Sequence, residues 1–434
     1  MFRVSFKALG LALMAAPVWA ADLPFEEPVF PAVDAAQVEL GQLLFYDPIL
    51  SGSKTVSCAT CHHPKFATGD GVSLGLGDGA NGLGPDRVAD PKNLPEQRIP
   101  RNAPPLFNLG ATEFTVFFHD GRLEEDATRP SGIRTPLGSE MEMGFASALS
   151  AQSMFPVLSA DEMAGHYSEN DISQAVRQGL ITGPGGAWDR LSQRIEAIPE
   201  YRTRFDDVIG DKPIHFTDIS DAVAAFLDFE WRGVASPFDL YLRNGTEMEP
   251  AAMRGMDLFY GKAGCADCHA GRFQTDHDFH AIAMPQIGPG KAARFESHAQ
   301  DTGRMRVTGD VQDAYAFRTP PLRNVAQTAP YGHGGAYASL EAVVRHHLDP
   351  VASLRSYNIG QAIMPGFDAA DMRVLNDPAE VDRIAAANDL APVNLNDAEV
   401  DDILAFLHAL TDPQSIRGAL GIPATVPSGL PVDQ

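Results

Sequence analysis

The four cysteines of this 434-residue chain form two Cys-x-x-Cys pairs, and a histidine directly follows each pair. The motifs read C-A-T-C-H and C-A-D-C-H and contain the residues Cys58, Cys61, His62, Cys265, Cys268 and His269. Two thiols at this spacing can bond to the two vinyl groups of one porphyrin, and the adjacent histidine can then coordinate the iron. The motifs therefore predict two covalently bound c-type haems, with His62 and His269 as iron ligands.

Two other kinds of site also use cysteine pairs. A zinc site built from all four thiolates gives no role to a histidine after both pairs. A thioredoxin-like redox site needs only one pair. Haem attachment is the interpretation that uses every residue of both motifs.

The stretches around the two motifs repeat in the same order along the chain. GQLLFY at 41–46 precedes the first motif, and GMDLFY at 255–260 precedes the second. Further on, RNAPPLFN and FFHDG in the first half correspond to RTPPLRNV and YGHGG in the second. This parallel order predicts two duplicated haem domains, over residues 21–225 and 226–434, with the junction near 215–235.

The elements that must position these motifs are mainly helical. Apolar spacing and capping residues predict helices over 34–46, 171–180, 218–232, 249–260, 339–347 and 397–410. Two long irregular stretches, 68–105 and 270–317, are expected to cover the cofactors, since long loops in compact domains usually serve a function. The expected fold is mainly α, with two cytochrome-c-like haem domains, long loops and little strand.

The first twenty residues have the pattern of a secretory signal peptide. Arg3 and Lys7 precede a short apolar stretch, and a small-x-small cleavage site ends at Ala20. We therefore expect a cleaved leader over residues 1–20 and a periplasmic mature protein. The apolar stretch is too short to cross a bilayer, and no later stretch approaches that length, so no membrane span is expected.

The chain is strongly acidic. Its formal net charge is −24, and removal of Arg3 and Lys7 with the leader makes it −26. Nucleic-acid binding requires a basic surface, so this class of function is excluded. The charge favours a basic protein partner, although simple solubility explains it equally well.

The sequence around the motifs resembles the bacterial dihaem cytochrome c peroxidase and MauG superfamily. The stretches that carry the resemblance include LGQLLFYDPILSGSKTVSCATCHHPKFATGDG, FFHDGR, RGMDLFYGKAGCADCHAGRFQTD and RTPPLRNVAQTAPYGHGGAYASLEAVVRHH. They span nearly the whole mature chain in the order of the family. The resemblance implies a peroxidatic N-terminal haem with an accessible distal face. It also implies a six-coordinate C-terminal haem that relays electrons.

The resemblance also implies a set of distal residues for the N-terminal haem. AQSMFPVLSADEM matches the Gln, Pro and Glu-Met spacing of the family with Gln152, Pro156 and Glu162. Glu162 is then the acid–base group that moves a proton between the two oxygens of peroxide. Gln152 orients peroxide or a water molecule, and Pro156 closes the pocket.

A calcium ion is expected between the domains on the same grounds. By register, its ligands are the side chain of Asn102 and the backbone carbonyls of Thr328 and Pro330. All three supply oxygen, as a hard cation requires. No acidic loop marks this position, and ordinary loop residues are the alternative interpretation.

Two positions depart from the family pattern near the N-terminal haem. His119 stands where many members have a tryptophan that relays electrons between the haems; the alternative is a structural role, with a hydrogen bond to a haem propionate. Many members also carry a switchable histidine after the first motif, whereas this chain has no histidine from Gly69 to Phe118. This favours a permanently open peroxidatic haem.

A third departure concerns the C-terminal haem. Its distal ligand, a methionine or tyrosine in the family, falls fourteen residues after the histidine of the Pro-Tyr-x-His motif, which here is His347. The C-terminal haem is therefore expected to have two histidine ligands, His269 and His347. His346 and Met364 are the fallback ligands. A bis-histidine haem should have a lower potential than one with a methionine ligand.

Three functions follow as hypotheses. The first is a periplasmic peroxidase that reduces hydrogen peroxide at the N-terminal haem with electrons from a small redox protein. The second is a MauG-like oxidase that uses high-valent iron to modify a side chain, such as tryptophan, of a partner protein. The third, an electron carrier with two closed haems, requires a second distal ligand that the sequence does not supply.

Overall fold

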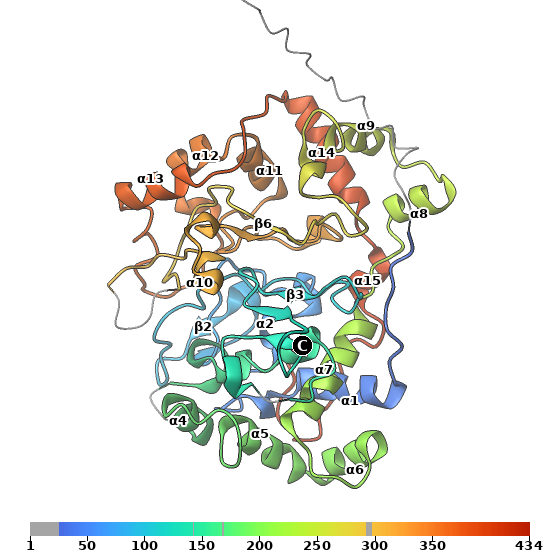
Figure 1. Ribbon diagram of the computed structural model, residues 1–434, viewed down its shortest axis with the longest axis vertical. Helices are drawn as coiled ribbons and strands as arrows, with labels where there is room; N and C mark the ends of the chain where they lie inside the picture. Colours follow the sequence, from blue (N-terminus) through green and yellow to red (C-terminus); the bar gives the residue numbers. More distant parts are fainter. Residues whose placement is uncertain (1–25, 142, 167–168, 292–296) are drawn as a thin grey trace, which may run out of the picture.

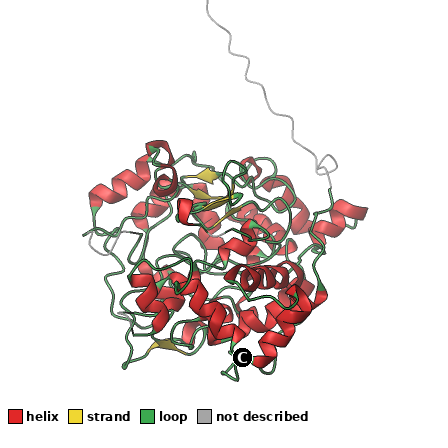
Figure 2. Ribbon diagram, turned by 60° about the horizontal axis from the view of Figure 1, so that its bottom comes forward, coloured by secondary structure: helices red, strands yellow, loops and turns green. Residues whose placement is uncertain are grey.

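The computed structural model describes residues 26–434, except residues 142, 167–168 and 292–296. Figures 1 and 2 show a helix-rich molecule in which loops connect many short helices. The predicted mainly α character is confirmed, whereas the predicted signal peptide lies outside the described residues. No helix among the described residues is long and apolar enough to cross a membrane.

The six predicted helices are all present within a few residues of their expected bounds. They are α1 (Ala35–Tyr46), α4 (Asp171–Arg177), α7 (Phe216–Glu230), α9 (Pro250–Phe259), α11 (Leu340–Leu348) and α14 (Asp397–Ala409). The structure adds α2 (Cys58–Cys61), α3 (Ala148–Gln152), α5 (Ala187–Glu196), α6 (Pro199–Ile209), α8 (Pro237–Asn244), α10 (Met305–Thr308), α12 (Pro350–Ser356), α13 (Pro378–Ala386) and α15 (Pro413–Arg417).

Strand content is low, as predicted. Three small antiparallel sheets occur in the described ranges, and they consist of β1 (Ala80–Asn81) with β2 (Val88–Ala89), β3 (Val116–Phe117) with β4 (Leu123–Glu125) and β5 (Ile133–Arg134), and β6 (Phe279–His280) with β7 (Phe317–Arg318). The stretches 68–105 and 270–317 are otherwise turns, 3₁₀ segments and loops, with α10 as their one α-helix in the described part.

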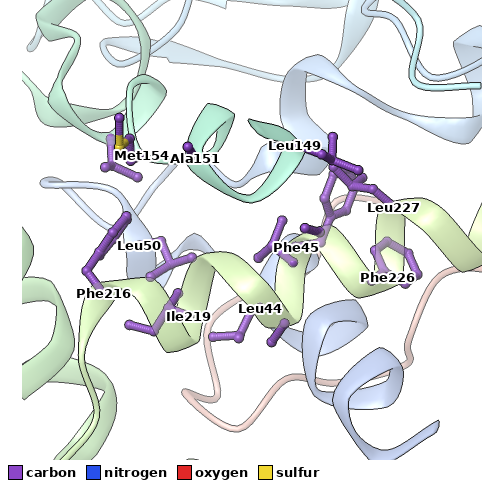
Figure 3. Close-up of a cluster of buried hydrophobic side chains, with 14 of the residues drawn as sticks. Leu44, Phe45, Leu50, Leu149, Ala151, Met154, Phe216, Ile219, Phe226 and Leu227 are labelled. Carbon is purple, nitrogen blue, oxygen red and sulfur yellow. The ribbon is translucent and has the colours of Figure 1, made fainter. Parts of the chain in front are cut away.

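The same helix crossing occurs once in each half of the chain. Helix α1 packs across α7, and α9 packs across α14. The crossings are close because a glycine faces the partner helix: a Cβ on Gly41 would overlap the carbonyl oxygen of Ala222, and one on Gly255 that of Asp402. Figure 3 shows the first crossing, with apolar side chains of α1, α3 and α7 facing one another.

Aromatic contacts at the two crossings also correspond. Phe45 of α1 lies 5.3 Å from Phe226 of α7, measured between ring centroids. Phe259 of α9 lies 5.1 Å from Phe406 of α14. The repeated GQLLFY and GMDLFY stretches therefore form equivalent packing units ahead of the two Cys-x-x-Cys-His motifs.

The turns that follow repeat as well. Asn108 and Asn324 both have a φ of 62°, in the left-handed region that asparagine tolerates better than most residues. The amide of Asn108 donates to the Trp231 carbonyl, and that of Asn324 donates to the Leu410 carbonyl, each at 3.1 Å. The RNAPPLFN and RTPPLRNV stretches thus hold the C-terminal ends of α7 and α14 in the same manner.

The two halves meet through a reciprocal pair of backbone hydrogen bonds. The Asn102 amide donates to the His333 carbonyl, and the Arg318 amide donates to the His119 carbonyl, each at 2.8 Å. Asn102 and Arg318 occupy equivalent positions of the repeat, as do His119 and His333. The contact therefore has the character of a local two-fold axis.

The C-terminal segment 418–434 returns to the first half, which the sequence did not predict. Gln42 donates to the Gly421 carbonyl at 2.8 Å, and Ser428 Oγ donates to Asp47 at 2.7 Å. Val426 is buried in the apolar cluster of the first half. In Figure 1 the C-terminus lies beside α2 and α7, far from the red helices α13 and α14.

Candidate dihaem active site

The first Cys-x-x-Cys-His motif lines a cavity in the first half. Helix α2 carries both cysteines, and the Ser57 amide donates to Thr60 Oγ1 at 2.9 Å to start this single turn. Both cysteines are free thiols, and burial raises the pKa of each to about 12. The motif residues that line the cavity are Cys58, Cys61 and His62.

The ring of His62 is oriented by the backbone. Its Nδ1 lies 3.0 Å from the Thr68 carbonyl oxygen. Because a carbonyl can only accept, Nδ1 carries the proton and Nε2 keeps a lone pair for a metal ion. His62 is thus prepared to act as an iron ligand.

The three predicted distal residues line the same cavity. Gln152 ends α3, Pro156 begins a 3₁₀ turn at Pro156–Leu158, and Glu162 lies in a π-helical turn, Ala160–Ala164. Such π turns are rare and often occur at functional sites. The structure therefore brings a carboxyl and an amide to the cavity that contains the first thiol pair.

Burial raises the pKa of the Glu162 carboxyl above its ordinary value, while the positive charges of Lys291 and Arg122 and a hydrogen bond from Ser159 act against this rise. A carboxyl with a raised pKa is suited to exchange protons near neutral pH. The opposing cations keep the ionised form accessible. This balance is what an acid–base group requires.

The predicted cover loop 68–105 holds Glu162 in place. The Asp78 amide donates to the Glu162 carbonyl at 2.9 Å. A Cβ on Gly77 would overlap the backbone of the π turn, so only glycine permits this approach. Arg87 is buried and donates to the carbonyls of Leu76, Gly77 and Gly82 at 2.5–2.7 Å, which fixes the loop.

Arg122 and Lys291 also line the cavity, and neither was singled out from the sequence. Arg122 follows the FFHDG stretch; its guanidinium lies 3.6 Å from the centroid of the Phe118 ring and hydrogen-bonds Asp120. Lys291 comes from the second half, and burial lowers its pKa to about 8. The motif FFHDGR is a usable signal for Arg122, whereas nothing local marks Lys291.

His119 also lines the cavity, and its Nε2 lies 3.0 Å from the Asn102 carbonyl oxygen. Burial and the charge of Arg101 lower the pKa of His119 to about 3, so the ring is neutral. The carbonyl places the proton on Nε2, which leaves Nδ1 as an acceptor. One ring nitrogen is therefore engaged with the backbone at the contact between the halves.

The second motif has the same arrangement on its proximal side. His269 Nδ1 lies 3.0 Å from the Gln274 carbonyl oxygen, as His62 does from that of Thr68. Both residues whose carbonyls accept these bonds have a positive φ, 52° at Gln274 and 65° at Thr68. The hydrogen bond that orients the motif histidine is thus the same in both halves.

His347 faces His269 across the second motif. Their ring centroids lie 6.4 Å apart, and His347 Nδ1 is 2.7 Å from the Val343 carbonyl oxygen, which frees Nε2. Two facing imidazoles that bind one metal ion at about 2 Å from each nitrogen have centroids roughly 6.3 Å apart. The spacing therefore fits a shared iron between the two rings.

His346, the neighbouring fallback ligand, is engaged elsewhere. It is fully buried, with Nδ1 3.0 Å from the Tyr337 hydroxyl and Nε2 2.8 Å from the Ile282 carbonyl oxygen. Both nitrogens have protein partners, which leaves neither for iron. The other fallback, Met364, is half-buried.

The donor sets fit two c-type haems. Each motif offers two free thiols and an imidazole whose Nε2 is available. Among the residues that the structure describes, a zinc interpretation has one partial candidate, since Cys268, Asp276 and His280 have ligand atoms within 4.8 Å of one another. This set uses one of the two thiols of the second motif and leaves out His269, so it does not account for the repeated pattern.

At the expected calcium position, the side chain of Asn102 donates from Nδ2 to the carbonyls of Val72 and Ser73 at 2.8 and 3.2 Å. This turns Oδ1 away from these carbonyls, and no hydrogen bond to Oδ1 is present within the described residues. Thr328 and Pro330 lie just before the 332–335 loop that Asn102 contacts. The oxygen donors suit a hard cation.

The family described as di-haem cytochrome c peroxidase matches residues 35–247. The methylamine utilization protein MauG of Methylorubrum extorquens is 32% identical over 72% of this chain and 68% of its own length. Cytochrome c551 peroxidase of Pseudomonas aeruginosa is 26% identical over 88% of this chain and 80% of its own.

Solved structures agree with these sequence matches. A MauG-like protein associated with microbial copper homeostasis has a TM-score of 0.59 at 27% identity, covering 92% of this chain and 97% of that one. The diheme peroxidase BthA from Burkholderia thailandensis shares the fold, with a TM-score of 0.58 at 22% identity over 94% and 92% of the two chains. The chain therefore belongs to the family of dihaem cytochrome c peroxidases and MauG proteins.

Proposed function

We propose that this enzyme reduces hydrogen peroxide at a haem held by His62, with electrons that arrive through a second haem held by His269 and His347. The observation that carries the proposal is the difference between the two distal sides. The first motif shares its cavity with Glu162 and Gln152, whereas the ring of His347 faces the second motif histidine. Each haem, when bound, supplies an iron that exchanges single electrons and, on a free face, binds peroxide.

Glu162 accepts a proton from the inner oxygen of peroxide and returns it to the outer oxygen, which leaves as water. Its raised pKa, opposed by Lys291 and Arg122, supports both directions of transfer. Gln152 orients peroxide by hydrogen bonding, and Pro156 restricts the width of the cavity. The Gly77 contact holds the π turn of Glu162 against the cavity wall.

The open distal face is supported by the histidines of the first cavity. Within the described residues, the lining contains His62 and His119. The Nε2 of His119 is hydrogen-bonded to the Asn102 carbonyl, which anchors this ring at the contact between the halves. The role of His119 is then to connect the cavity with the contact between the halves.

The wider organisation is part of the same proposal. Residues 21–225 and 226–434 form two haem domains, except that segment 418–434 packs on the first. Calcium at Asn102, Thr328 and Pro330 stabilises the contact between them. A leader over residues 1–20 directs the protein to the periplasm, and its electrons come from a small redox protein.

A MauG-like oxidation of a partner protein is the second candidate function. It is favoured by the absence of a histidine between Gly69 and Phe118 and by His347 in place of methionine. The relative named MauG, at 32% identity, is consistent with it. The substrate in this case is a side chain, such as tryptophan, of a partner protein.

The test is the resting absorption and EPR spectrum, followed by peroxide turnover with a reduced small cytochrome c. We expect one high-spin and one low-spin haem, and steady oxidation of the cytochrome. Two low-spin haems would contradict the open first site. A normal resting spectrum with a spectral reaction to peroxide but negligible cytochrome oxidation would favour the second candidate.

A further inference from the structure

Arg318 is half-buried at the contact between the two halves, and its guanidinium forms no ion pair with a carboxylate among the described residues. Within the described residues, its side chain forms one hydrogen bond, from Nη1 to the Thr319 carbonyl at a long 3.3 Å. Its Nε is buried without a hydrogen-bond partner. A planar group with five donors is therefore left almost unused.

Other buried arginines of the chain are matched. Arg101 forms a two-pronged contact with Asp301 at 2.7 and 2.8 Å, and Arg323 lies 2.8 Å from Asp239. Arg87 has no ion pair but donates to three backbone carbonyls. These buried guanidinium groups are thus paired with carboxylates or with several backbone carbonyls, because an unpaired buried charge is costly.

The position of Arg318 lies between the two motifs. Its backbone amide donates to the His119 carbonyl, and its charge lowers the pKa of His119, a residue that lines the first cavity. On the other side, Thr275 of the second motif loop donates to the Thr319 carbonyl at 2.8 Å. The backbone of Arg318 and Thr319 therefore connects the first cavity with the loop of the second motif.

The local two-fold arrangement allows Arg318 to be compared with its equivalent residue in the first half. Arg318 is the counterpart of Asn102 in the repeat. Asn102 places a neutral amide oxygen at its position, where a hard cation can bind. Arg318 places a cation, and burial without a counter-ion lowers its pKa to about 10. An anionic group can pair with the guanidinium at this position.

We propose that Arg318 binds a propionate carboxylate of a bound haem and holds it, ionised, at the contact between the two halves. The proposal rests on the proposed dihaem function, since a haem carries two carboxylates and c-type attachment fixes their position relative to the motif. Arginine and carboxylate form parallel hydrogen bonds of high geometric specificity. Arg318 then both orients one haem and sets part of its reduction potential.

The first test is spectroelectrochemical titration of both haems in the full-length holoprotein and in Arg318→Gln. Loss of a positive charge beside a propionate stabilises the oxidised haem. We expect the potential of one haem to fall by about 59 mV, a tenfold change in its reduction equilibrium. The haem that shifts identifies which propionate is bound.

Arg306→Gln is the matched control, because Arg306 is exposed on the nearby helix α10. We expect the reduction potentials of both haems in Arg306→Gln to equal those of the wild type. Unchanged potentials in Arg318→Gln, with both haems attached, would overturn the proposal. A shift of the same size in Arg306→Gln would also overturn it, since the effect would then be one of general charge.

If Arg318→Gln yields no holoprotein, the Arg318→Lys variant provides the test instead. Lysine keeps the charge but loses the paired hydrogen bonds, so the propionate bending band in the resonance Raman spectrum should move. An unmoved band overturns the proposal. These readouts are independent of turnover: a shifted potential with no peroxide reduction leaves Arg318 as the anchor and rejects the peroxidase function.

Discussion

The two halves of the molecule support their motif histidines alike but differ on the opposite side. His62 and His269 are each oriented by a carbonyl five or six residues further on. The chain then diverges after the equivalent residues His119 and His333. In the first half, thirty-three residues (152 − 119) lead to Gln152, whereas in the second, fourteen (347 − 333) lead to His347.

The difference shows how a duplicated scaffold can acquire two roles. The helix crossing, the asparagine turn and the motif are kept in both halves, so both halves offer a cofactor the same support. A single segment, at the same point of the repeat, determines what faces the iron. A long insertion supplies the Glu162 carboxyl to the first half, and a short helix supplies the His347 imidazole to the second.

The largest expected effect is that of Glu162→Gln, which removes the proposed acid–base group from the first half alone. General acid–base catalysis contributes typically 10²- to 10⁴-fold, so we expect peroxide turnover to fall at least ~100-fold with both haem spectra retained. Asp161→Asn, on the same π turn, is the control and should keep its activity. Turnover of Glu162→Gln within a few-fold of the wild type would assign the proton transfer to another group.

His347→Ala tests the second half in the same way. Removal of the facing ring should convert the low-spin signal of one haem to high spin throughout the sample, as measured by EPR. His346→Ala should leave the signal low-spin and instead cost about 1–3 kcal/mol of unfolding free energy, because the Tyr337 and Ile282 groups lose their partner. An unchanged spectrum in His347→Ala would show that another residue ligates the iron.

The duplicated scaffold is tested by Gly41→Ala and Gly255→Ala. In each case the new Cβ overlaps a carbonyl oxygen of the facing helix, and overpacking of this kind typically costs about 1–3 kcal/mol. We expect similar losses in denaturant unfolding for both variants. Gly366→Ala, where nothing lies within 4 Å, should be neutral. A large loss for one glycine and none for the other would argue against equivalent crossings.

The pH dependence of turnover should also arise from the first half, through the ionisation of Glu162. Burial raises the Glu162 pKa, and proton acceptance needs the ionised form. Turnover should therefore be constant at high pH and fall about tenfold per unit below the raised pKa. The fold favours the protonated form, so this group adds stability as pH falls through that pKa. In Glu162→Gln the acidic limb should disappear.

The smallest effect is expected at the C-terminal segment. Thr60, inside the first motif, donates to Asp433 at 2.6 Å. Asp433→Asn weakens this bond, so we expect a loss of about 1 kcal/mol in unfolding free energy and faster proteolysis near α2, with the second motif unaffected. Gln434→Ala is the control, since Gln434 is exposed. Equal effects of the two substitutions would show that the contact with Thr60 is unimportant.

The sequence by itself predicted the parts of the molecule that depend on local spacing. The cysteine and histidine motifs, the six helices with strong apolar patterns and the two irregular stretches all follow from residues close together in the chain. The repeat of GQLLFY and GMDLFY also predicted a structural repeat, because the same glycine and phenylalanine make the same crossing in both halves. Helices such as α5 and α6 were not singled out, although Trp188, Leu191 and Ile195 have helical spacing.

Tertiary structure decided the rest, because it depends on contacts between residues far apart in the chain. Lys291 enters the first cavity from the second half, and segment 418–434 crosses back to the first motif. VVRHH placed His346 and His347 side by side, but only the Tyr337 hydroxyl and the Ile282 carbonyl show which ring is engaged elsewhere. No local pattern encodes these long-range partners, since each is fixed by how two folded halves pack.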